Sequence, residues 1–177
     1  MRAVFDTCIL VPTFLRAVLL TCAETCNVEF IVSPHILEEW ARVAKTPLQR
    51  LESEIAVAQF REKFAITIRP DPLLLEQFWL PDPNDIHILA LAVNQHSDVI
   101  ITHNKKDFPQ DELRSYGIDR MDPDAFLRRL LKQHGDEIVS VTKPILAEAR
   151  NQHVGLSASN IWRKAWLPQF GRMIEKL

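Results

Sequence analysis

Short apolar runs along the first part of the chain predict the strands of a β-sheet. The run from Val99 to Ile101 is apolar at every position and ends at Thr102, as is typical of a central strand in a parallel sheet. The other runs are similarly short and end at polar residues or turn-forming residues. The predicted strands cover residues 3–5, 28–32, 65–68, 99–102 and 117–121.

Stretches with apolar residues at helical spacing separate these runs. Pro12 and Pro34 stand at the starts of two such stretches, and proline is common in the first turn of a helix. Ser33 is a suitable N-cap residue for the second of them. The predicted helices cover residues 13–24, 34–44 and 85–93 and also begin at Pro47 and Pro123. For the helix at Pro47, the predicted inward residues are Leu51, Ile55, Ala58 and Phe60.

Strands and helices therefore alternate up to Gly135. This alternation favours an α/β fold with a parallel sheet flanked by helices, joined by right-handed connections. After Gly135 the pattern predicts helices only, at residues 136–152, 157–166 and 168–176. We therefore expect an α/β domain over residues 1–134 and a helical C-terminal extension over residues 135–177.

The net charge of −2 gives no signal for binding a polyanion over the whole molecule. Its distribution is uneven, because residues 138–177 contain six Lys or Arg and two acidic residues, which leaves +4 there and −6 elsewhere. An acidic body beside a basic tail is compatible with metal binding and nucleic-acid binding. A solvated helical face is the alternative explanation of the basic tail.

The three cysteines are an odd number, and no signal peptide precedes them. This favours a reducing cytoplasm over an oxidising compartment. The apolar stretch at residues 9–23 contains a proline and an arginine and is shorter than the ~20 residues that span a bilayer. We therefore expect a cytoplasmic protein without a membrane segment.

Four acidic residues stand where a strand or a helix would expose them. Carboxylates at the ends of parallel strands meet in the crevice where open sheets bind ligands. Several such carboxylates without His or Cys favour a hard cation such as Mg²⁺ or Mn²⁺, and hence phosphodiester chemistry. The four residues are Asp6, Glu39, Asp85 and Asp107.

Two of these positions have a competing neighbour. Glu38 precedes Glu39, and Asp82 lies in the turn sequence before Asp85. Asp82 is followed by proline and is typical of a turn, whereas Asp85 begins a buried helix that it is able to cap. The order of preference is Asp6 and Asp85 first, then Asp107 and then Glu39.

Four local segments, in this order and spacing, are similar to those of one family. The first strand ends in Val4-Phe5-Asp6-Thr7, and a helix after Ser33 carries Glu39-Trp40. Asp85 precedes a buried helix with small residues, and residues 101–108 read Ile-Thr-His-Asn-Lys-Lys-Asp-Phe. The chain thus resembles the PIN-domain nucleases over residues 3 to about 126, and within them the VapC-type ribonuclease toxins.

The resemblance implies one or two Mg²⁺ or Mn²⁺ ions held by Asp6, Asp85 and Asp107, with Glu39 near them as a further catalytic residue. Many relatives carry an acidic residue in place of Asn104, which leaves that role to Asp107 here. A hydroxyl and an amide near the site are able to orient a carboxylate or the phosphate, and cations near it are able to bind the RNA backbone. The candidates for these supporting roles are Thr102, Asn104, Lys105 and Arg16. For the two cations, an ordinary solvated surface role is the alternative, and Arg16 could also pair with a carboxylate of the site.

The resemblance further implies a metal-dependent endoribonuclease that leaves a 5′-phosphate and a 3′-hydroxyl. As the toxin of a toxin–antitoxin pair, it would bind RNA, form a homodimer and be silenced by a small antitoxin protein. The alternative is a catalytically weak PIN-fold regulator that binds RNA or a partner, which the retained carboxylates disfavour. A phosphatase of the haloacid dehalogenase type would need a second aspartate two residues after Asp6, and position 8 is Cys8.

Overall fold

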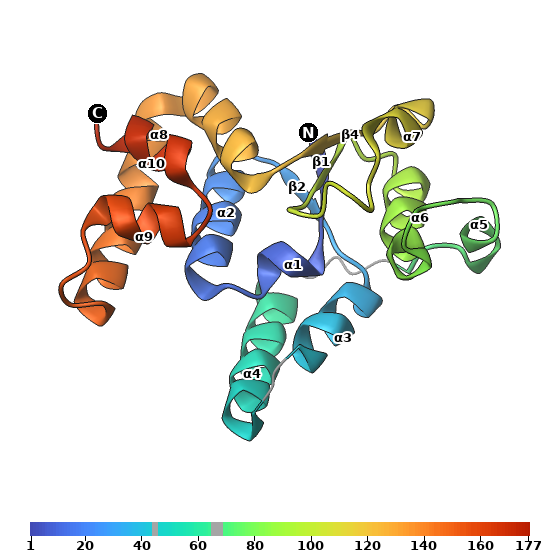
Figure 1. Cartoon of the computed structure of the whole chain (residues 1–177), viewed down its shortest axis with the longest axis horizontal. Helices are drawn as coiled ribbons and strands as arrows, with labels where there is room; N and C mark the ends of the chain where they lie inside the picture. Colours follow the sequence, from blue (N-terminus) through green and yellow to red (C-terminus); the bar gives the residue numbers. More distant parts are fainter. Residues whose placement is uncertain (44–45, 65–68) are drawn as a thin grey trace. The chain divides into compact units, whose positions relative to one another are not determined.

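The computed structural model describes residues 1–43, 46–64 and 69–177 (Figure 1). Within these residues the strands form one four-stranded sheet in the order β2-β1-β3-β4, and β1 pairs in parallel with both β2 and β3. The strands are β1 (Arg2–Phe5), β2 (Glu29–Ile31), β3 (Val99–Ile101) and β4 (Asp119–Met121). The predicted α/β fold with a parallel sheet is confirmed, and the predicted strand at residues 65–68 lies outside the described residues.

Most helices begin at the proline or capping residue that the sequence indicates. The Ser33 side chain accepts a hydrogen bond from the Ile36 amide, and Thr46 forms a capping box with Gln49. The helices are α1 (Thr7–Leu10), α2 (Thr13–Thr25), α3 (Pro34–Arg42), α4 (Pro47–Lys63), α5 (Pro72–Leu75), α6 (Ile86–Asn94), α7 (Gln110–Ser115), α8 (Pro123–Gln152), α9 (Ala158–Lys164) and α10 (Pro168–Ile174), with a 3-10 turn η1 (Pro83–Asp85) before α6. Within the described ranges, no helix is both long and apolar enough to cross a membrane.

The chain divides into two compact units that do not follow the chain order. The first comprises Met1–Val11 and Glu29–Arg120, and the second comprises Pro12–Val28 and Met121–Leu177. The predicted domain boundary after residue 134 falls inside α8, where His134 departs from helical backbone angles. That boundary stays a prediction.

In the first unit, the sheet core is formed by the two central strands and α6. Val4 on β1 and Ile100 on β3 are fully buried, and α6 packs against β1. The buried residues of α6 lie on several sides of the helix, as its nearly continuous apolar sequence predicts. This packing fixes the first turn of α6 near the ends of β1 and β3.

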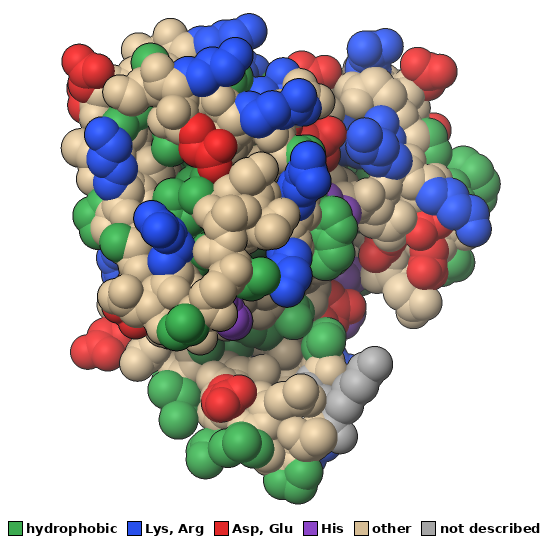
Figure 2. Space-filling model, turned by 60° about the vertical axis from the view of Figure 1, so that its left-hand side comes forward, with side chains coloured by type: hydrophobic (Ala, Val, Ile, Leu, Met, Phe, Trp, Pro, Cys, Tyr) green, Lys and Arg blue, Asp and Glu red, His purple; other side chains and the backbone are tan. Residues whose placement is uncertain are grey.

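Helix α4 buries fewer residues than its sequence predicts. Of the predicted inward residues, only Phe60 is buried, while Leu51 and Ile55 are 54% and 50% exposed and Ala58 is also exposed. The prediction was wrong because only the C-terminal half of α4 is anchored, through contacts of Phe60 with Trp40 and Phe64. Figure 2 shows hydrophobic side chains at the lower end of the molecule, where α4 lies.

The second unit is helical. Helix α2 packs against α8, and α9 and α10 pack against α8 and against each other (Figure 1). Trp162 on α9 meets Phe170 on α10 edge to face, with ring centroids 5.5 Å apart. Leu167 between them is fully buried, whereas Trp166 is 58% exposed.

A buried carboxylate joins α8 to α10 within this unit. Asp124 is 6% exposed, and its Oδ1 accepts hydrogen bonds from the amides of Gln169 and Phe170, each 2.9 Å long. Its Oδ2 accepts from Arg128 Nε at 2.9 Å. Asp124 therefore satisfies two amides in the first turn of α10, which have no partner within the helix.

The Asp124→Ala variant should lose about 2–4 kcal/mol of unfolding free energy, because two amides and one guanidinium lose a charged acceptor. Urea unfolding followed by circular dichroism measures this loss. The Asp136→Ala variant, at an exposed position of the same helix, serves as the matched control. Equal stability of both variants would contradict this role of Asp124.

Candidate active site

Two central strands end side by side in polar residues. Strand β1 leads into Asp6, and β3 leads into Thr102, whose Oγ1 donates a 2.5 Å hydrogen bond to Asp6 Oδ2. The Asp6 amide donates to the carbonyl of Ile101, so pairing of the two strands continues to this point. Asp6 is 6% exposed and Thr102 is fully buried. The position and orientation of the Asp6 carboxylate are therefore fixed by the central sheet.

Asp6 also caps the short helix that follows it. Its carboxylate accepts from the Cys8 amide at 3.4 Å and from the Cys8 thiol at 2.9 Å. Burial, followed by the nearby Asp6 charge, raises the pKa of Cys8 to about 12. Cys8 is therefore a neutral hydrogen-bond donor to Asp6. The sequence pattern did not indicate this contact, because Cys8 lies inside an apolar run.

Asn104 connects the loop after β3 to the first turn of α6. Its backbone N–H donates to Thr102 Oγ1 at 2.9 Å, and its side-chain Nδ2 donates to Asp85 Oδ2 at 3.0 Å. Its Oδ1 accepts from the Asp107 amide at 3.3 Å. One amide side chain thus holds the Asp85 carboxylate and shapes the backbone that carries Asp107. The orienting role of Asn104 toward a carboxylate or the phosphate stays a prediction.

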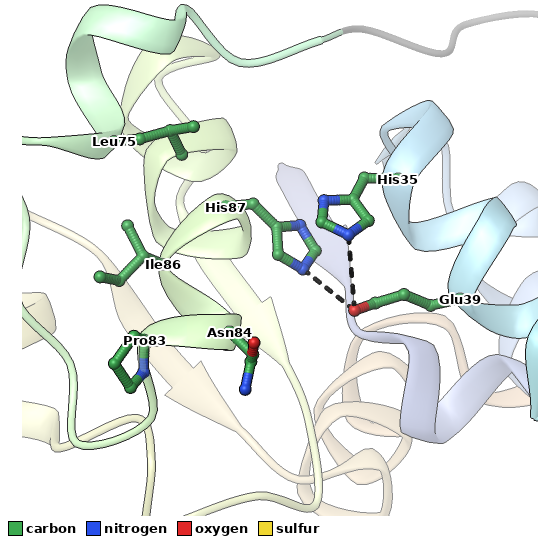
Figure 3. Close-up of a pocket in the computed structure, with 7 residues that line it drawn as sticks. All are labelled: His35, Glu39, Leu75, Pro83, Asn84, Ile86 and His87. Carbon is green, nitrogen blue, oxygen red and sulfur yellow. Dashed lines mark ion pairs between the residues drawn. The ribbon is translucent and has the colours of Figure 1, made fainter.

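Glu39 projects from α3 and has different partners on its two oxygens. Thr7 Oγ1 donates to Glu39 Oε2 at 2.7 Å. Glu39 Oε1 lies 3.8 Å from His35 Nε2 and 3.5 Å from His87 Nε2, and Figure 3 shows both imidazoles pointing toward it. Glu38 is exposed on the same helix, so only Glu39 faces these groups.

Three aspartates form a group that could hold a metal ion. Carboxylate oxygens of Asp82, Asp85 and Asp107 all lie within 4.8 Å of one another. Asp82 caps η1 by accepting from the Asn84 amide at 2.9 Å, as its turn sequence predicts. It also stands beside Asp85, a proximity that the turn sequence alone does not reveal. The donors are all carboxylate oxygens, which fits a hard divalent cation such as Mg²⁺ or Mn²⁺.

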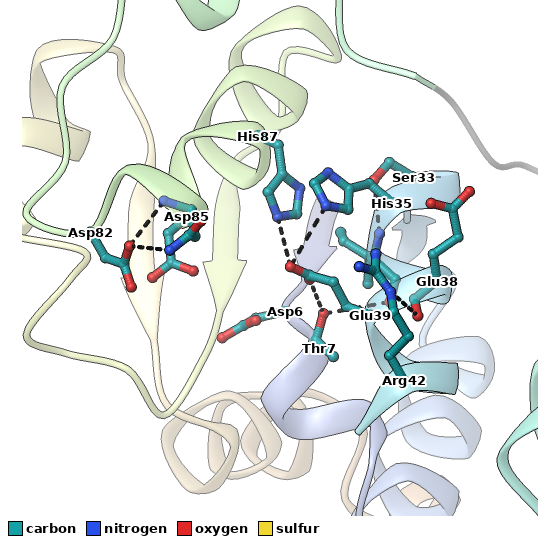
Figure 4. Close-up of polar contacts among 12 residues, drawn as sticks. Asp6, Thr7, Ser33, His35, Glu38, Glu39, Arg42, Asp82, Asp85 and His87 are labelled. Carbon is teal, nitrogen blue, oxygen red and sulfur yellow. Dashed lines mark hydrogen bonds and ion pairs between the residues drawn. The ribbon is translucent and has the colours of Figure 1, made fainter. Parts of the chain in front are cut away.

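Asp85 experiences the combined charge of the other carboxylates. Burial is the largest cause that raises its pKa, followed by the charges of Asp6, Asp82, Asp107 and Glu39, and together they bring it to about 7. Although Asp85 stands at the N-cap of α6, its side chain makes no capping hydrogen bond. Figure 4 shows Asp6, Asp85 and Glu39 projecting from three different elements toward the same region. The structure therefore brings all four predicted carboxylates into one electrostatic group.

The two predicted cations have separate positions. Lys105 is exposed on the loop between Asn104 and Asp107, and its carbonyl accepts from Arg120 Nη1 at 2.9 Å. Arg16 lies on α2 and belongs to the second unit, where burial lowers its pKa. The substrate-binding roles of Lys105 and Arg16 stay predictions.

The fold and this carboxylate group define an α/β domain with an acidic site at the ends of its parallel strands. A match to the PIN domain covers residues 2–106, more than half of the chain, and the chain belongs to the PIN domain family. Over 43 residues it is 49% identical to a Mycobacterium tuberculosis protein named "Putative ribonuclease VapC50". That match covers 24% of this chain and 25% of the relative, so the chain spans a quarter of the relative's length. No solved structure matches the chain. The predicted family is confirmed.

The raised pKa of Asp85 predicts a pH dependence of stability in the metal-free protein. The ordinary pKa of 3.8 applies in the unfolded chain and about 7 in the folded one, so the folded protein binds this proton more tightly. The stability that this proton contributes is therefore fully present below about pH 4 and is lost as the pH rises through about 7. Above that pH, the unfolding free energy no longer changes with the charge of Asp85. We expect a loss of about 1–2 kcal/mol, because solvent screens a partly exposed carboxylate.

Urea unfolding in EDTA at about pH 4.5 and about pH 7.5 measures this change. The Asp85→Asn variant should lack it. The Asp111→Asn variant should retain it, since the Asp111 side chain is fully exposed on α7. A wild-type protein with the same pH dependence as Asp85→Asn would contradict the assignment.

Proposed function

We propose that this protein is a metal-dependent endoribonuclease that hydrolyses RNA phosphodiester bonds. The observation that carries the proposal is the convergence of carboxylates around Asp85, whose pKa is raised to about 7 by burial first and then by the charges of these neighbours. Like charges so close together resist joint ionisation, and a divalent cation relieves that repulsion. Such a group costs folding stability when all its members are ionised, so its presence supports a binding role.

The proposed ligands of Mg²⁺ or Mn²⁺ are Asp6, Asp85 and Asp107. The proximity of Asp82 to the last two adds a further carboxylate to the group. When bound, the cation would lower the pKa of an attacking water and offset the charge of the scissile phosphate. One ion and two ions are both compatible with this number of carboxylates.

The remaining groups keep these carboxylates in place. Thr102 donates to Asp6 Oδ2 and Asn104 donates to Asp85 Oδ2, and these hydrogen bonds orient the two carboxylates. The Glu39 carboxylate, fixed by Thr7, is proposed to accept a proton from the attacking water. Lys105 is exposed beside the site and would bind the RNA backbone as a point charge. Attack by water on the phosphorus with the 3′-oxygen as the leaving group would break the P–O3′ bond and leave a 5′-phosphate and a 3′-hydroxyl, the products that the family resemblance implies.

The choice of RNA as substrate rests on the family and on the relative named as a ribonuclease. By the same likeness we propose that the chain is the toxin of a toxin–antitoxin pair, with a small antitoxin as its partner and a homodimer as its assembly. We further propose residues 1–134 as the catalytic domain and residues 135–177 as a helical extension. The family match at residues 2–106 lies inside the first range.

Purified protein should cleave structured RNA with Mn²⁺ or Mg²⁺ and lose this activity in EDTA. The Asp6→Asn and Asp85→Asn variants should be slower by about 100-fold or more, because each removes a charged ligand. Gel analysis of labelled RNA gives the rates, and mass spectrometry of the products identifies their ends.

The Asp111→Asn variant should cleave at the wild-type rate, since Asp111 is exposed and outside the carboxylate group. Circular dichroism of every variant separates loss of fold from loss of chemistry. Cleavage in EDTA, or equal rates in Asp6→Asn and the wild type, would contradict the proposed mechanism.

The toxin role predicts that expression of the wild-type chain arrests growth of a bacterial host, because its RNA is cleaved. Growth curves after induction measure the effect. Expression of Asp6→Asn at the same level should leave growth unchanged. Normal growth with an active wild-type enzyme would favour a role in RNA processing instead of toxicity.

A further inference from the structure

A second cluster of side chains, apart from the group of Asp82, Asp85 and Asp107, lies around Oε1 of Glu39. His35 and Glu39 are one turn apart on α3, and His87 projects from the first turn of α6 toward them (Figure 3). The two imidazoles stack with ring centroids 4.0 Å apart and an angle of 27° between their planes. One ligand atom from each of the three side chains lies within 4.8 Å of the others.

His87 is the unusual member of this cluster. It is 5% exposed, and within the described part of the chain neither of its ring nitrogens has a hydrogen-bond partner. Glu39 Oε1 lies 3.5 Å from its Nε2, a distance longer than that of ordinary protein hydrogen bonds. Buried polar groups without a partner are rare in proteins and often mark the place of an ion or a ligand.

The distances agree with a shared metal ion. Ligands about 2.1 Å from a tetrahedral ion lie about 3.4 Å from each other. The His87 to Glu39 distance of 3.5 Å already has this value, and the His35 to Glu39 distance of 3.8 Å is slightly longer. His35 is half exposed, so its ring is able to move the remaining distance without disturbing the core.

The cluster also has room for a fourth ligand. The three side chains line a cavity of about 330 Å³, together with Asn84, Ile86 and other residues of the same unit. A site with three protein ligands and an open position is the arrangement found where zinc binds a water or a substrate. A purely structural zinc site would use four protein ligands.

We propose that His35, Glu39 and His87 bind a borderline divalent transition metal such as Zn²⁺, with one coordination position open to the cavity. Two imidazoles and one carboxylate favour Zn²⁺ over Mg²⁺, which takes oxygen ligands and keeps its waters. The site differs in its ligand chemistry from the group of Asp82, Asp85 and Asp107 and goes beyond the proposed nuclease function. Glu39 belongs to this cluster and also has the catalytic role proposed above.

Isothermal titration calorimetry of the full chain with Zn²⁺, in excess Mg²⁺, tests the proposal. We expect one Zn²⁺ to bind per chain with Mg²⁺ present. The same site should bind Co²⁺ and give the visible absorption of a four-coordinate ion. Each ligand substitution should reduce the Zn²⁺ affinity by at least about tenfold.

The principal variant is His35→Gln, because His35 is exposed and its loss leaves the core intact. The matched control is His153→Gln, which changes an exposed histidine in the second unit and should bind Zn²⁺ as the wild type does. His87→Gln, checked for folding by circular dichroism, tests the buried ligand. Asp85→Asn should retain Zn²⁺ binding, and this separates the present proposal from the nuclease proposal.

Three outcomes would overturn the proposal. The first is no Zn²⁺ binding, and the second is equal affinity in His35→Gln and the wild type. The third is loss of Zn²⁺ binding in Asp85→Asn but not in His35→Gln, which would place the ion among the aspartates. A protein that binds Zn²⁺ as proposed but fails to cleave RNA would refute only the nuclease function.

Discussion

Repulsion among carboxylates at the ends of the parallel strands is the interaction around which this part of the molecule is organised. Asp85 has four acidic neighbours, and their charges add to burial in raising its pKa to about 7. Asp82 lies in the same turn as Asp85, whereas Asp6, Glu39 and Asp107 come from other segments of the chain and are held near Asp85 by the tertiary packing. The hydrophobic packing of β1, β3 and α6 therefore supplies the free energy that offsets this repulsion.

Neutral donors determine how the carboxylates are arranged once they are close. Thr102, Asn104 and Thr7 each donate to a different one of them, namely Asp6, Asp85 and Glu39. A positively charged side chain in these places would neutralise a carboxylate and compete with a cation. Hydroxyl and amide groups orient the oxygens and leave their charge available. The hydrogen bonds thus preserve the property that makes the site suitable for a metal.

The sequence predicts the parts of this arrangement that depend on residues close to one another along the chain. Asp6 follows an apolar strand, Asp85 precedes an apolar helix, and parallel pairing brings strand ends to one edge. The position of Asp82 beside Asp85 and Asp107 could not be predicted in the same way, because its proline context already explains it as a turn residue. The exposure of Leu51 and Ile55 on α4 was also missed, since helical spacing gives the apolar side of a helix but not what packs against it.

His87 illustrates a further limit of pattern-based prediction. His87 lies near the start of a buried apolar helix, where a histidine is expected to be a packed residue or a residue at the rim of the core. The structure buries it. Its significance depends on a stacked partner from α3, which the sequence separates from it by a long segment. Only the pairing of α3 with α6 around Glu39 brings the two imidazoles together.

The two carboxylate oxygens of Glu39 face different sets of neighbouring atoms. Oε2 is held by Thr7 on the side of Asp6, where the surrounding donors are oxygens. Oε1 faces two imidazole nitrogens, where the donor set is softer. Under the two proposals above, a single carboxylate between an all-oxygen group and a nitrogen-rich group would allow neighbouring sites to select different cations by ligand type alone. The rigid position of Glu39 on α3, set by the Ser33 cap and its buried neighbours, is what keeps these two environments apart.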